Sequence, residues 1–310
     1  MELMHIPLEQ IQIQNSHFRY RTHLTDEKLA QTMKNSGICD PVYLLIRDKS
    51  PSIIDGFKRI HVLSEHFPSS FPVPAVTLKE KELTWKTHLA LVLNQDTRGT
   101  LPFIEKVWAY QMLKKNYAIR DDSEILRALN LPDRPDYHKI YPQLTRIPQE
   151  WIRFFTDHLV PGRRIKTMVE AIDLKSCTSL LNVVPGLNRL EQMIIMLSEI
   201  EKREKLPAAK ILQNLLIDIQ EEPIRSETLF LRLREIRFPL RSKYEKKLDD
   251  ALKALHPPPF VSTQCDKNGE RPGAEIFANI QSPKDSEEFL SWFEKKKDSI
   301  NTLLNERLEL

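Results

Sequence analysis

Two adjacent cations closely follow a glycine in the run Gly56-Phe-Lys58-Arg59, where an apolar, strand-like segment gives way to a helical pattern. The first turn of a helix leaves backbone N–H groups unpaired and carries the positive end of the helix dipole. Together with neighbouring Lys and Arg side chains, these donors suit the oxygens of a phosphate group. Taken alone, however, the pattern favours a basic helix end exposed to solvent over a ligand site.

A second signal lies about twenty residues earlier. Gly37 follows a helix-like segment and precedes Pro41, which opens an apolar run typical of a buried strand. By itself this pair only marks where one element ends and the next begins.

The composition restricts the kind of site. The chain of 310 residues has only 7 glycines, and none of them forms the nucleotide-binding loops GxGxxG or GxxxxGKS. Its 3 cysteines are far apart and odd in number, which offers neither a disulfide framework nor a CxxC metal pair. No run approaches the roughly 20 apolar residues of a membrane span, and the N-terminal segment lacks a signal-peptide pattern. We therefore expect a cytoplasmic protein with no membrane association.

Charge is uneven along the chain. The net charge is only +3, but residues 101–170 carry 12 basic and 9 acidic side chains, while residues 257–310 carry 7 and 10. The basic excess in a helical stretch weakly indicates a polyanionic partner.

Strand and helix signals alternate over residues 1–80. Thr25 is expected as a helix N-cap, Lys49-Ser50-Pro51 as a hairpin turn, and the prolines of the last run indicate an edge strand. The predicted order is strand, helix, strand, strand, helix and strand, over residues 5–13, 25–36, 41–48, 51–56, 57–67 and 71–78.

The 3.6-residue helical period takes over from Glu82 to Leu255. Beyond it, two strands joined by a turn at Lys267-Asn268-Gly269 precede an amphipathic helix over 285–308. We therefore expect an α+β fold that is predominantly helical. The predicted domains are an α/β domain, a helix-turn-helix domain, a helical region and a hairpin-plus-helix module, at 1–95, 96–170, 171–256 and 257–310.

The two glycine-containing boxes together resemble the N-terminal domain of the ParB/sulfiredoxin superfamily, in which a GIxxPV-type box precedes a strand, a glycine and a basic helix start. Family members carry GERR or DGxxR in the second box, and this chain has Asp55-Gly56-Phe57-Lys58-Arg59. Sulfiredoxins need a cysteine in that box. Phe57 occupies the position here, which disfavours peroxiredoxin-repair chemistry.

The resemblance extends to about residue 170 and favours the ParB branch. ParB proteins continue with ENxQR and a LNPIEEA-like helix; here NQDTR at 94–98 and LPFIE at 101–105 keep the arginine and the Leu-Pro-x-Ile-Glu start. Residues 122–144 then supply a helix, a proline-rich break and a second helix, in helix-turn-helix order.

This resemblance implies a DNA-binding protein switched by CTP or another nucleoside triphosphate, active in DNA partitioning or transcriptional regulation and associated with the nucleoid. The residues that it implies for binding the nucleotide are Gly37, Pro41, Gly56, Lys58, Arg59, Gln95 and Arg98.

The resemblance also implies Mg²⁺ on the triphosphate. Where ParB has the acidic residue of ENxQR, this chain has Asn94, whose amide oxygen can ligate Mg²⁺ but adds no charge. Glu105 is the nearest carboxylate. With Asn94 and Glu105 as the candidate catalytic residues, and Asn94 as the metal ligand, we expect at most slow, Mg²⁺-dependent hydrolysis.

Pro142 bears on DNA binding, because it falls about two turns after Pro135 and should kink or end the second helix of the pair. Readout of bases should then be weak. The predicted contacts with double-stranded DNA are to phosphates, from Arg134, His138, Lys139 and Arg146.

Residues 171–310 carry no motif for chemistry, and their amphipathic helices predict a homodimer or a protein partner. Two other classes remain open. The superfamily includes ATP-dependent phosphotransferases of the sulfiredoxin and serine-kinase type, and a degenerate ParB-like chain could serve only to bind a protein.

Overall fold

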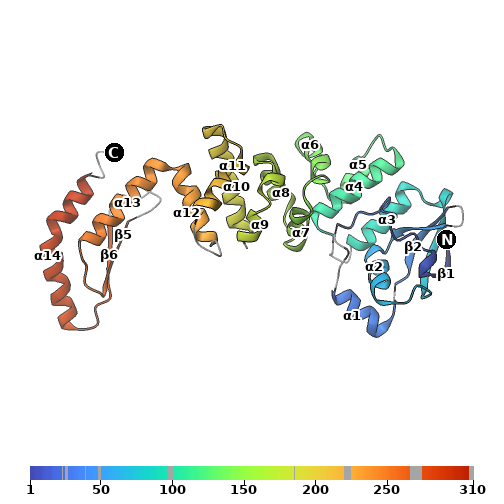
Figure 1. Cartoon of the computed structure of the whole chain (residues 1–310), viewed down its shortest axis with the longest axis horizontal. Coiled ribbons are helices and arrows are strands. Elements are labelled where there is room, and N and C mark those ends of the chain that lie inside the picture. Colours follow the sequence, from blue (N-terminus) through green and yellow to red (C-terminus); the bar gives the residue numbers. More distant parts are fainter. Residues whose placement is uncertain are drawn as a thin grey trace. The chain divides into compact units, whose positions relative to one another are not determined.

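The computed structural model describes every residue except 23, 25–26, 39, 48–49, 97–100, 185, 220–224, 266–273 and 307–310. The chain divides into two compact units, 1–214 and 215–310, whose elements are labelled in Figure 1. The division falls inside helix α11 (Ala208–Asp218). The fold is mixed α and β and mostly helical, as expected. The finer domain boundaries after residues 95, 170 and 256 stay predictions.

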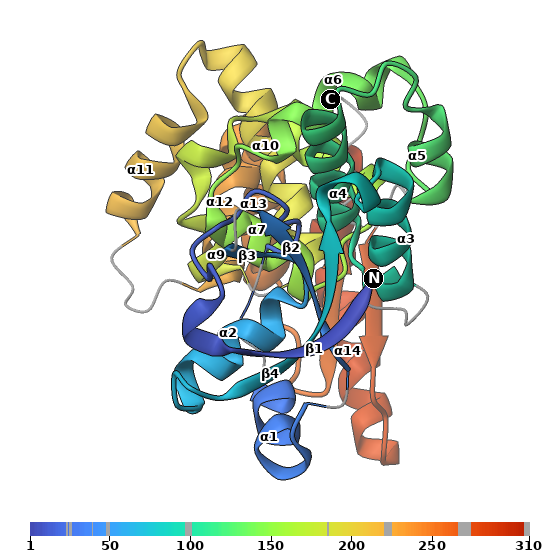
Figure 2. The ribbon, with the colours of Figure 1, turned by 90° about the vertical axis from the view of Figure 1, so that its right-hand side faces the viewer.

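Unit 1 begins with a four-stranded sheet in the order β1-β4-β2-β3 (Figure 2). Its strands are β1 (Glu2–Pro7), β2 (Val42–Arg47), β3 (Ser50–Asp55) and β4 (Pro72–Lys79). The edge strands β1 and β3 run antiparallel to their neighbours, and the central strands β2 and β4 are parallel. The predicted pairing of β2 with β3 is confirmed, while Lys49 of its turn lies outside the described residues.

The first strand is shorter than predicted. It ends at Pro7, where the sequence pattern had suggested a strand over 5–13, because the 3₁₀ turn η1 (Leu8–Gln10) follows and buries Leu8. Thr25, the predicted N-cap of the next helix, lies outside the described residues.

The expectation that the last run is an edge strand is wrong, since β4 pairs with both β1 and β2. The prolines Pro72 and Pro74 are tolerated because the pairing with β2 begins only at Ala75. Before that residue β4 has a neighbour on one side alone, so the missing N–H groups remove no bond to β2.

Two helices accompany the sheet. Helix α1 (Glu27–Ser36) packs against α2 (Phe57–His66), and α2 packs against β2. Apolar residues of the strands and one face of α2 supply the core. Adjacent residues are fully buried in β2 (Leu44, Leu45) and in β3 (Ile53, Ile54), so these strands are covered on both faces, and Ile60 and Leu63 of α2 are fully buried as well.

Helices form the rest of unit 1, as the sequence period predicted. The turn η2 (Glu80–Glu82) leads into α3 (Trp85–Asp96), and α4 (Phe103–Tyr117) packs against α3. After the helix pair described below come α7 (Gln149–Asp157), α8 (Gly162–Ala171), η3 (Leu174–Cys177), α9 (Leu180–Val183), α10 (Leu187–Glu204) and α11.

The predicted helix pair is present as α5 (Ser123–Ala128) and α6 (Pro135–Leu144). Pro135 occupies the first turn of α6, where a missing N–H costs nothing. Pro142 lies in the last turn, and α6 ends two residues later at Leu144. Helix α6 packs against α4 and α8 through its buried residues Tyr137, Ile140, Tyr141 and Leu144.

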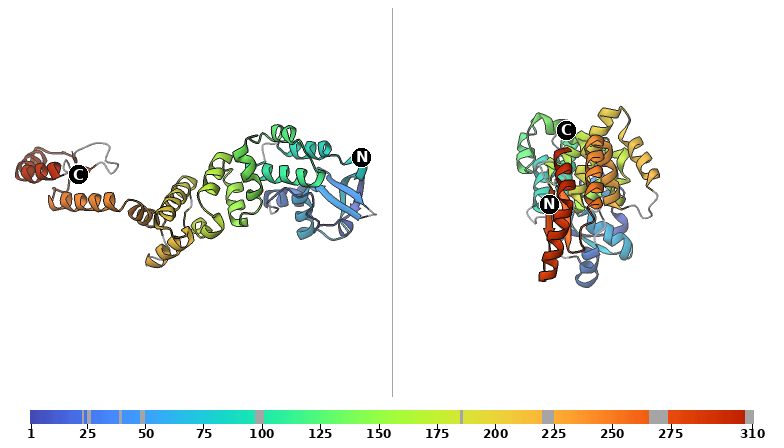
Figure 3. Two further views of the ribbon diagram at one scale, coloured as in Figure 1. Left: turned by 90° about the horizontal axis from the view of Figure 1, so that it is seen from above. Right: turned by 90° about the vertical axis from the view of Figure 1, so that its left-hand side faces the viewer.

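Unit 2 contains α12 (Ser226–Arg237), α13 (Pro239–Ala254), the antiparallel pair β5 (Val261–Cys265) and β6 (Ala274–Ala278), and α14 (Pro283–Glu306), as Figure 3 shows by colour. The turn predicted at 267–269 lies outside the described residues.

The amphipathic face of α14 is covered in part by its own unit. Trp292 and Ile300 are buried with Leu252, Leu255 and Val261, and the Trp292 indole donates a 3.0 Å hydrogen bond to the Leu255 carbonyl. Leu290 and Phe293 of the same helix stay exposed. Across the described residues, no helix is long and apolar enough to span a bilayer.

Candidate functional site

The turn between β3 and α2 can be made only with glycine at position 56. Gly56 has a φ of 97°, in the left-handed region, and is the N-cap of α2. A Cβ atom there would lie 2.7 Å from Cγ1 of Val42 on the adjacent strand β2. Both the backbone angle and the close approach of β2 exclude a side chain. The strand, glycine and helix start therefore form as the sequence predicted.

Arg59 connects this turn with the second predicted box. Its Nη1 atom donates hydrogen bonds to the carbonyls of Asp40 (2.7 Å) and Pro41 (2.8 Å), and its Nη2 atom lies 3.4 Å from Oδ2 of Asp55. The structure thus brings Pro41, Gly56 and Arg59 together. A guanidinium has five N–H donors, and three are used here. Two donors of Arg59 stay without a partner among the described residues.

Gly37 and Lys58 flank this turn in the sequence. Gly37 has a φ of 71°, and its N–H donates to the Met33 carbonyl, so it terminates α1 as predicted. Among the described residues, Gly37 makes no hydrogen bond with Arg59. Lys58 lies in the first turn of α2 and is half-buried.

Asp55 is the centre of a buried set of hydrogen bonds. Its carboxylate accepts from the Tyr20 hydroxyl (3.2 Å) and from Nε2 of Gln95 (3.3 Å), in addition to Arg59. The Asp55 side chain is only 8% exposed. Burial, reinforced by the charge of Asp55, raises the pKa of Tyr20, so its hydroxyl remains protonated and donates. The predicted nucleotide residue Gln95 therefore belongs to the same cluster as Arg59.

The chain of contacts continues from Gln95 to the start of α4. Oε1 of Gln95 accepts a 3.4 Å hydrogen bond from Nη2 of Arg21, and Nη1 of Arg21 pairs with Glu105 at 2.7 Å. The other carboxylate oxygen of Glu105 accepts from both the N–H (3.0 Å) and the hydroxyl (3.1 Å) of Thr22. Burial lowers the pKa of Arg21, but the charges of Glu105, Tyr20 and Asp55 and the hydrogen bond to Glu105 together outweigh burial, so the pKa is raised. We call Tyr20, Arg21, Asp55, Arg59, Gln95 and Glu105 the polar chain.

Glu105 is placed to hold structure together. Its side chain is 2% exposed, and both carboxylate oxygens carry hydrogen bonds from Arg21 or Thr22. Because these donors already occupy both oxygens and the side chain is buried, a substrate hydroxyl has no open approach to this carboxylate.

The predicted metal ligand Asn94 is exposed near the end of α3. No cluster of three or more His, Cys, Asp or Glu side chains suited to a metal ion occurs within the described ranges. Arg98, the last predicted nucleotide residue, lies outside them.

The predicted DNA contacts lie on or next to α6 and alternate with acidic residues. Arg134 pairs with Asp136 at 3.2 Å and its guanidinium stacks over the Tyr137 ring at 5.0 Å. His138 lies 2.7 Å from Asp133.

Two further cations of this group have no such partner among the residues that the structure describes. Lys139 is exposed in the middle of α6, and Arg146 is exposed just after its end. The outer surface of α6 therefore combines exposed positive charge with two carboxylates, Asp133 and Asp136.

Sequence reasoning missed the segment 19–22. The run Arg19-Tyr20-Arg21 lies between predicted elements and has neither helical nor strand periodicity. Its one signal is the alternation of cations with an aromatic residue in an otherwise unpatterned stretch. The partners of Arg21 and Thr22 are distant in the sequence, so no local pattern could identify them.

Neither the protein-family models nor the curated proteins compared with this chain give a match.

Proposed function

We propose that this chain is a ParB-like DNA-binding protein in which a nucleoside triphosphate, CTP or a relative, binds at the β3–α2 turn and controls the helical part of unit 1. The observation that carries the proposal is the polar chain, which runs without interruption from that turn to the first turn of α4. The class of ligand is inferred from the sequence resemblance. The hydrogen bonds of the polar chain connect the proposed ligand site with the helices that we propose to bind DNA.

The turn has suitable donors for phosphate oxygens. The first N–H groups of α2, the ammonium of Lys58 and the two remaining donors of Arg59 come from one short stretch of chain. Mg²⁺, when bound with the nucleotide, would neutralise phosphate charge, and the exposed amide of Asn94 is the side chain assigned to it.

A ligand at the turn can act on the helices through Arg59. An anion attracts the guanidinium that now holds the carbonyls of Asp40 and Pro41 and contacts Asp55. Any change at Asp55 is transmitted by Gln95 to the Arg21–Glu105 pair at the start of α4, and α4 packs against α6. A ligand acts as a switch only through different affinities for two arrangements, and the polar chain is the element that we expect to have two.

The hydrogen bonds that Asp55 and Glu105 accept favour ligand binding over group transfer as the function of this site. Asp55 and Glu105, the acidic members of the polar chain, each accept hydrogen bonds from several donors. A phosphotransferase needs a carboxylate free to receive the proton of a substrate hydroxyl. Hydrolysis is therefore proposed as slow, with the nucleotide acting mainly by being bound.

Calorimetric titration with CTP, ATP and GTP in the presence of Mg²⁺ tests the site. The Arg59→Ala variant should bind the preferred nucleotide about ten- to a hundredfold more weakly, since a charged hydrogen bond contributes roughly 1.5–3 kcal/mol. Arg47→Ala is the matched control, because Arg47 pairs with Glu80 on the surface and leaves the turn intact. Equal affinity in wild type and Arg59→Ala would exclude this turn as the site.

The switch needs a separate experiment. In Gln95→Met the polar chain is cut at its middle, so the nucleotide should bind but should no longer change the affinity for a short DNA duplex. Turnover at ordinary enzyme rates of about 1–10³ per second would instead support the phosphotransferase class. A chain that binds neither nucleotide nor DNA would support the protein-interaction class.

A further inference from the structure

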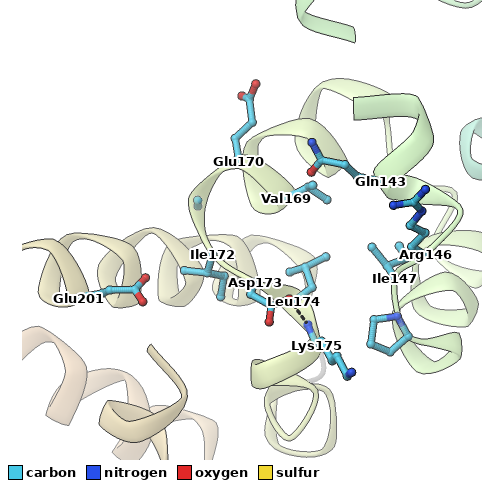
Figure 4. A pocket seen from close by; sticks show the side chains of 12 residues that line it. Gln143, Arg146, Ile147, Val169, Glu170, Ile172, Asp173, Leu174, Lys175 and Glu201 are labelled. Carbon is cyan, nitrogen blue, oxygen red and sulfur yellow. Dashed lines mark hydrogen bonds between the residues drawn. The ribbon is translucent and has the colours of Figure 1, made fainter. Parts of the chain in front are cut away.

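The cavity in Figure 4 and the outer edge of strand β1 both lie outside the polar chain. The cavity, of about 540 Å³, is lined by cations and carboxylates alike, among them Arg146, Lys175, Asp173 and Glu201. Charges of both signs around one opening favour no single class of ligand. The edge of β1 is more selective, because its backbone donors and acceptors have fixed positions that only another extended strand can match.

Strand β1 has a neighbouring strand on one side alone among the described residues. It pairs with β4 and forms one end of the sheet order β1-β4-β2-β3. The opposite edge, at β3, is covered. There the N–H of Gln12 donates a 2.9 Å hydrogen bond to the carbonyl of Pro51, and the Ser52 hydroxyl donates to the Gln12 side chain at 3.0 Å. The sheet is therefore closed at one edge and open at the other.

The hydrogen bonds to β4 show which groups of β1 point outward. In an antiparallel pair, residues that exchange hydrogen bonds with the neighbouring strand alternate with residues whose N–H and C=O point away from it. The N–H of Leu8 donates to the carbonyl of Phe71 at 3.0 Å, in register with the ladder. The even-numbered residues of β1 therefore bond to β4, and the odd-numbered residues Leu3, His5 and Pro7 face outward.

The open edge of β1 lacks the usual devices that protect an edge strand, which include lysines, bulges and prolines within the strand. Its register with β4 is regular from Glu2 to Pro7, it contains no lysine or arginine, and its one proline is its last residue. The apolar side chains of Leu3 and Met4 are 66% and 38% exposed. An edge of this kind can accept a further strand.

We propose that β1 pairs antiparallel with β1 of a second copy of this chain, with Met4 opposite Met4 of the second copy. Two identical antiparallel strands are related by a two-fold axis, so every contact between them occurs in both directions. In this register the outward N–H and C=O of Leu3 meet those of His5 of the second copy. Each outward N–H of β1 then has an acceptor.

The neighbouring registers leave backbone groups without partners. Centred on His5, the pairing would place Leu3 opposite Pro7, which has no N–H to donate. Centred on Leu3, it would place His5 opposite Met1, whose nitrogen already donates a 3.0 Å hydrogen bond to Glu82.

The exposed side chains also fit the register centred on Met4. Met4 packs against its equivalent, the two Leu3 side chains are diagonal neighbours, and no like charges face each other. A single pair of strands is small compared with the roughly 1,200–2,000 Å² of a stable interface, so we expect a weak and reversible contact. It requires neither the nucleotide site nor the homodimer predicted for residues 171–310.

Disulfide trapping in the full chain tests the register, because it captures weak contacts. Opposite Cα atoms of a pair that exchanges no hydrogen bonds lie about 4.5 Å apart, within the span of a disulfide. Met4→Cys should therefore form a covalent dimer when copper phenanthroline is the oxidant, as seen on a non-reducing gel. Wild type is the control for the native cysteines Cys39, Cys177 and Cys265.

The matched control is Leu3→Cys. Leu3 is more exposed than Met4, so random collisions should trap Leu3→Cys more readily. In the proposed register the two copies of Leu3 are diagonal, about 7–8 Å apart, which is too far for a disulfide. We therefore expect several-fold more dimer from Met4→Cys than from Leu3→Cys.

Two second-site variants test whether the strand edge makes the contact. His5→Pro removes an outward N–H but no hydrogen bond to β4, so in a Met4→Cys background it should lower the amount of dimer several-fold. Leu3→Lys places a charge beside its own equivalent and should do the same. Thermal unfolding verifies that both variants are folded.

Equal amounts of dimer from Leu3→Cys and Met4→Cys would indicate random collision and would overturn the proposal. It would also be overturned if neither His5→Pro nor Leu3→Lys reduced the Met4→Cys dimer, or if Met4→Cys gave no dimer at millimolar protein concentration.

Discussion

Arg21 and Glu105, which are 84 positions apart, form an ion pair of 2.7 Å in which the side chains are only 11% and 2% exposed. This pair fixes the unpatterned segment 19–22 against the start of α4. Gln149, the first residue of α7, also holds this segment, because its Nε2 atom donates a 2.9 Å hydrogen bond to the carbonyl of Thr22. The α/β part and the helical part of unit 1 are therefore joined by buried polar bonds.

The first prediction concerns the cost of breaking that pair. Arg21→Met leaves the Glu105 carboxylate buried without its cation, which should lower the free energy of unfolding by about 3–5 kcal/mol. Urea unfolding measures the change. Lys86→Met, which removes a surface pair with Glu124, is the control and should cost no more than about 1 kcal/mol. The double variant Arg21→Met/Glu105→Leu should recover part of the loss, and the absence of any recovery would contradict the assignment.

The second prediction concerns the glycine of the β3–α2 turn. In Gly56→Ala the left-handed backbone should cost about 1–2 kcal/mol, and the overlap of the new Cβ with Val42 a further 1–3 kcal/mol. In a Val42→Ala background the overlap with Cγ1 is gone, so the total cost should fall, although the Cβ of residue 42 still lies 3.0 Å from the new atom. Gly186→Ala is the control, because Gly186 has a φ of −115° and open space around it. Thermal unfolding of the four variants gives the comparison, and equal melting temperatures for Gly56→Ala and Gly186→Ala would refute the argument.

The elements that the sequence predicted best are those with local signals. Trp151 and Phe155 fall at helical spacing and are fully buried, and the hairpin of β2 and β3 follows from two β-rich runs separated by a short turn. The end of β1 and the central place of β4 were predicted wrongly. Which strand lies next to which depends on pairing between distant segments, as at Ala75, and a proline pattern does not report it.

The candidate site was predictable only where its residues lie close together in the sequence. Gly56 and Arg59 belong to one short box, and the sequence indicated them together. The binding partners of Arg59 at Asp40 and Pro41, and the link from Asp55 through Gln95 to Arg21, are contacts between segments. They arise from packing, and so only the structure could show that Arg59 also holds the preceding loop.

The third prediction concerns DNA binding by α6. Asp136 lies in the first turn of α6 and pairs with both Arg134 and Lys166. Asp136→Asn removes a negative charge and frees both cations, so affinity for a DNA duplex should rise at low salt. Lys139→Gln should weaken binding to all sequences alike and reduce the slope of log K against log salt by about 0.9. Lys34→Gln is the control, because Lys34 is exposed on α1 in the α/β part of unit 1.

Fluorescence anisotropy over a range of salt concentrations measures these effects. An affinity independent of salt, or a strong preference for one sequence that Lys139→Gln alters, would contradict phosphate contacts as the basis of binding.

The last prediction concerns the buried His88 of α3. Its ring is 0% exposed, Nδ1 lies 3.2 Å from the Tyr117 hydroxyl, and within the described residues Nε2 has no hydrogen-bond partner. Burial, with a smaller contribution from the charge of His17, lowers the pKa of His88 to about 4. The folded protein therefore keeps His88 neutral where the unfolded chain, with a pKa of about 6.5, takes up a proton.

Stability should consequently be full above pH 6.5 and should fall as the pH decreases from about 6.5 to about 4, because the unfolded state binds more protons in that interval. From pH 7 to pH 5 the loss attributable to His88 should be on the order of 2 kcal/mol. His88→Phe should remove that part of the pH dependence, whereas Tyr117→Phe, which keeps a titratable His88, should retain it. Since the pKa of His17 is also lowered, the His17→Asn variant measures how much of the pH dependence comes from His17. Calorimetric unfolding at the two pH values checks the result, and an unchanged pH dependence in His88→Phe would show that other groups are responsible.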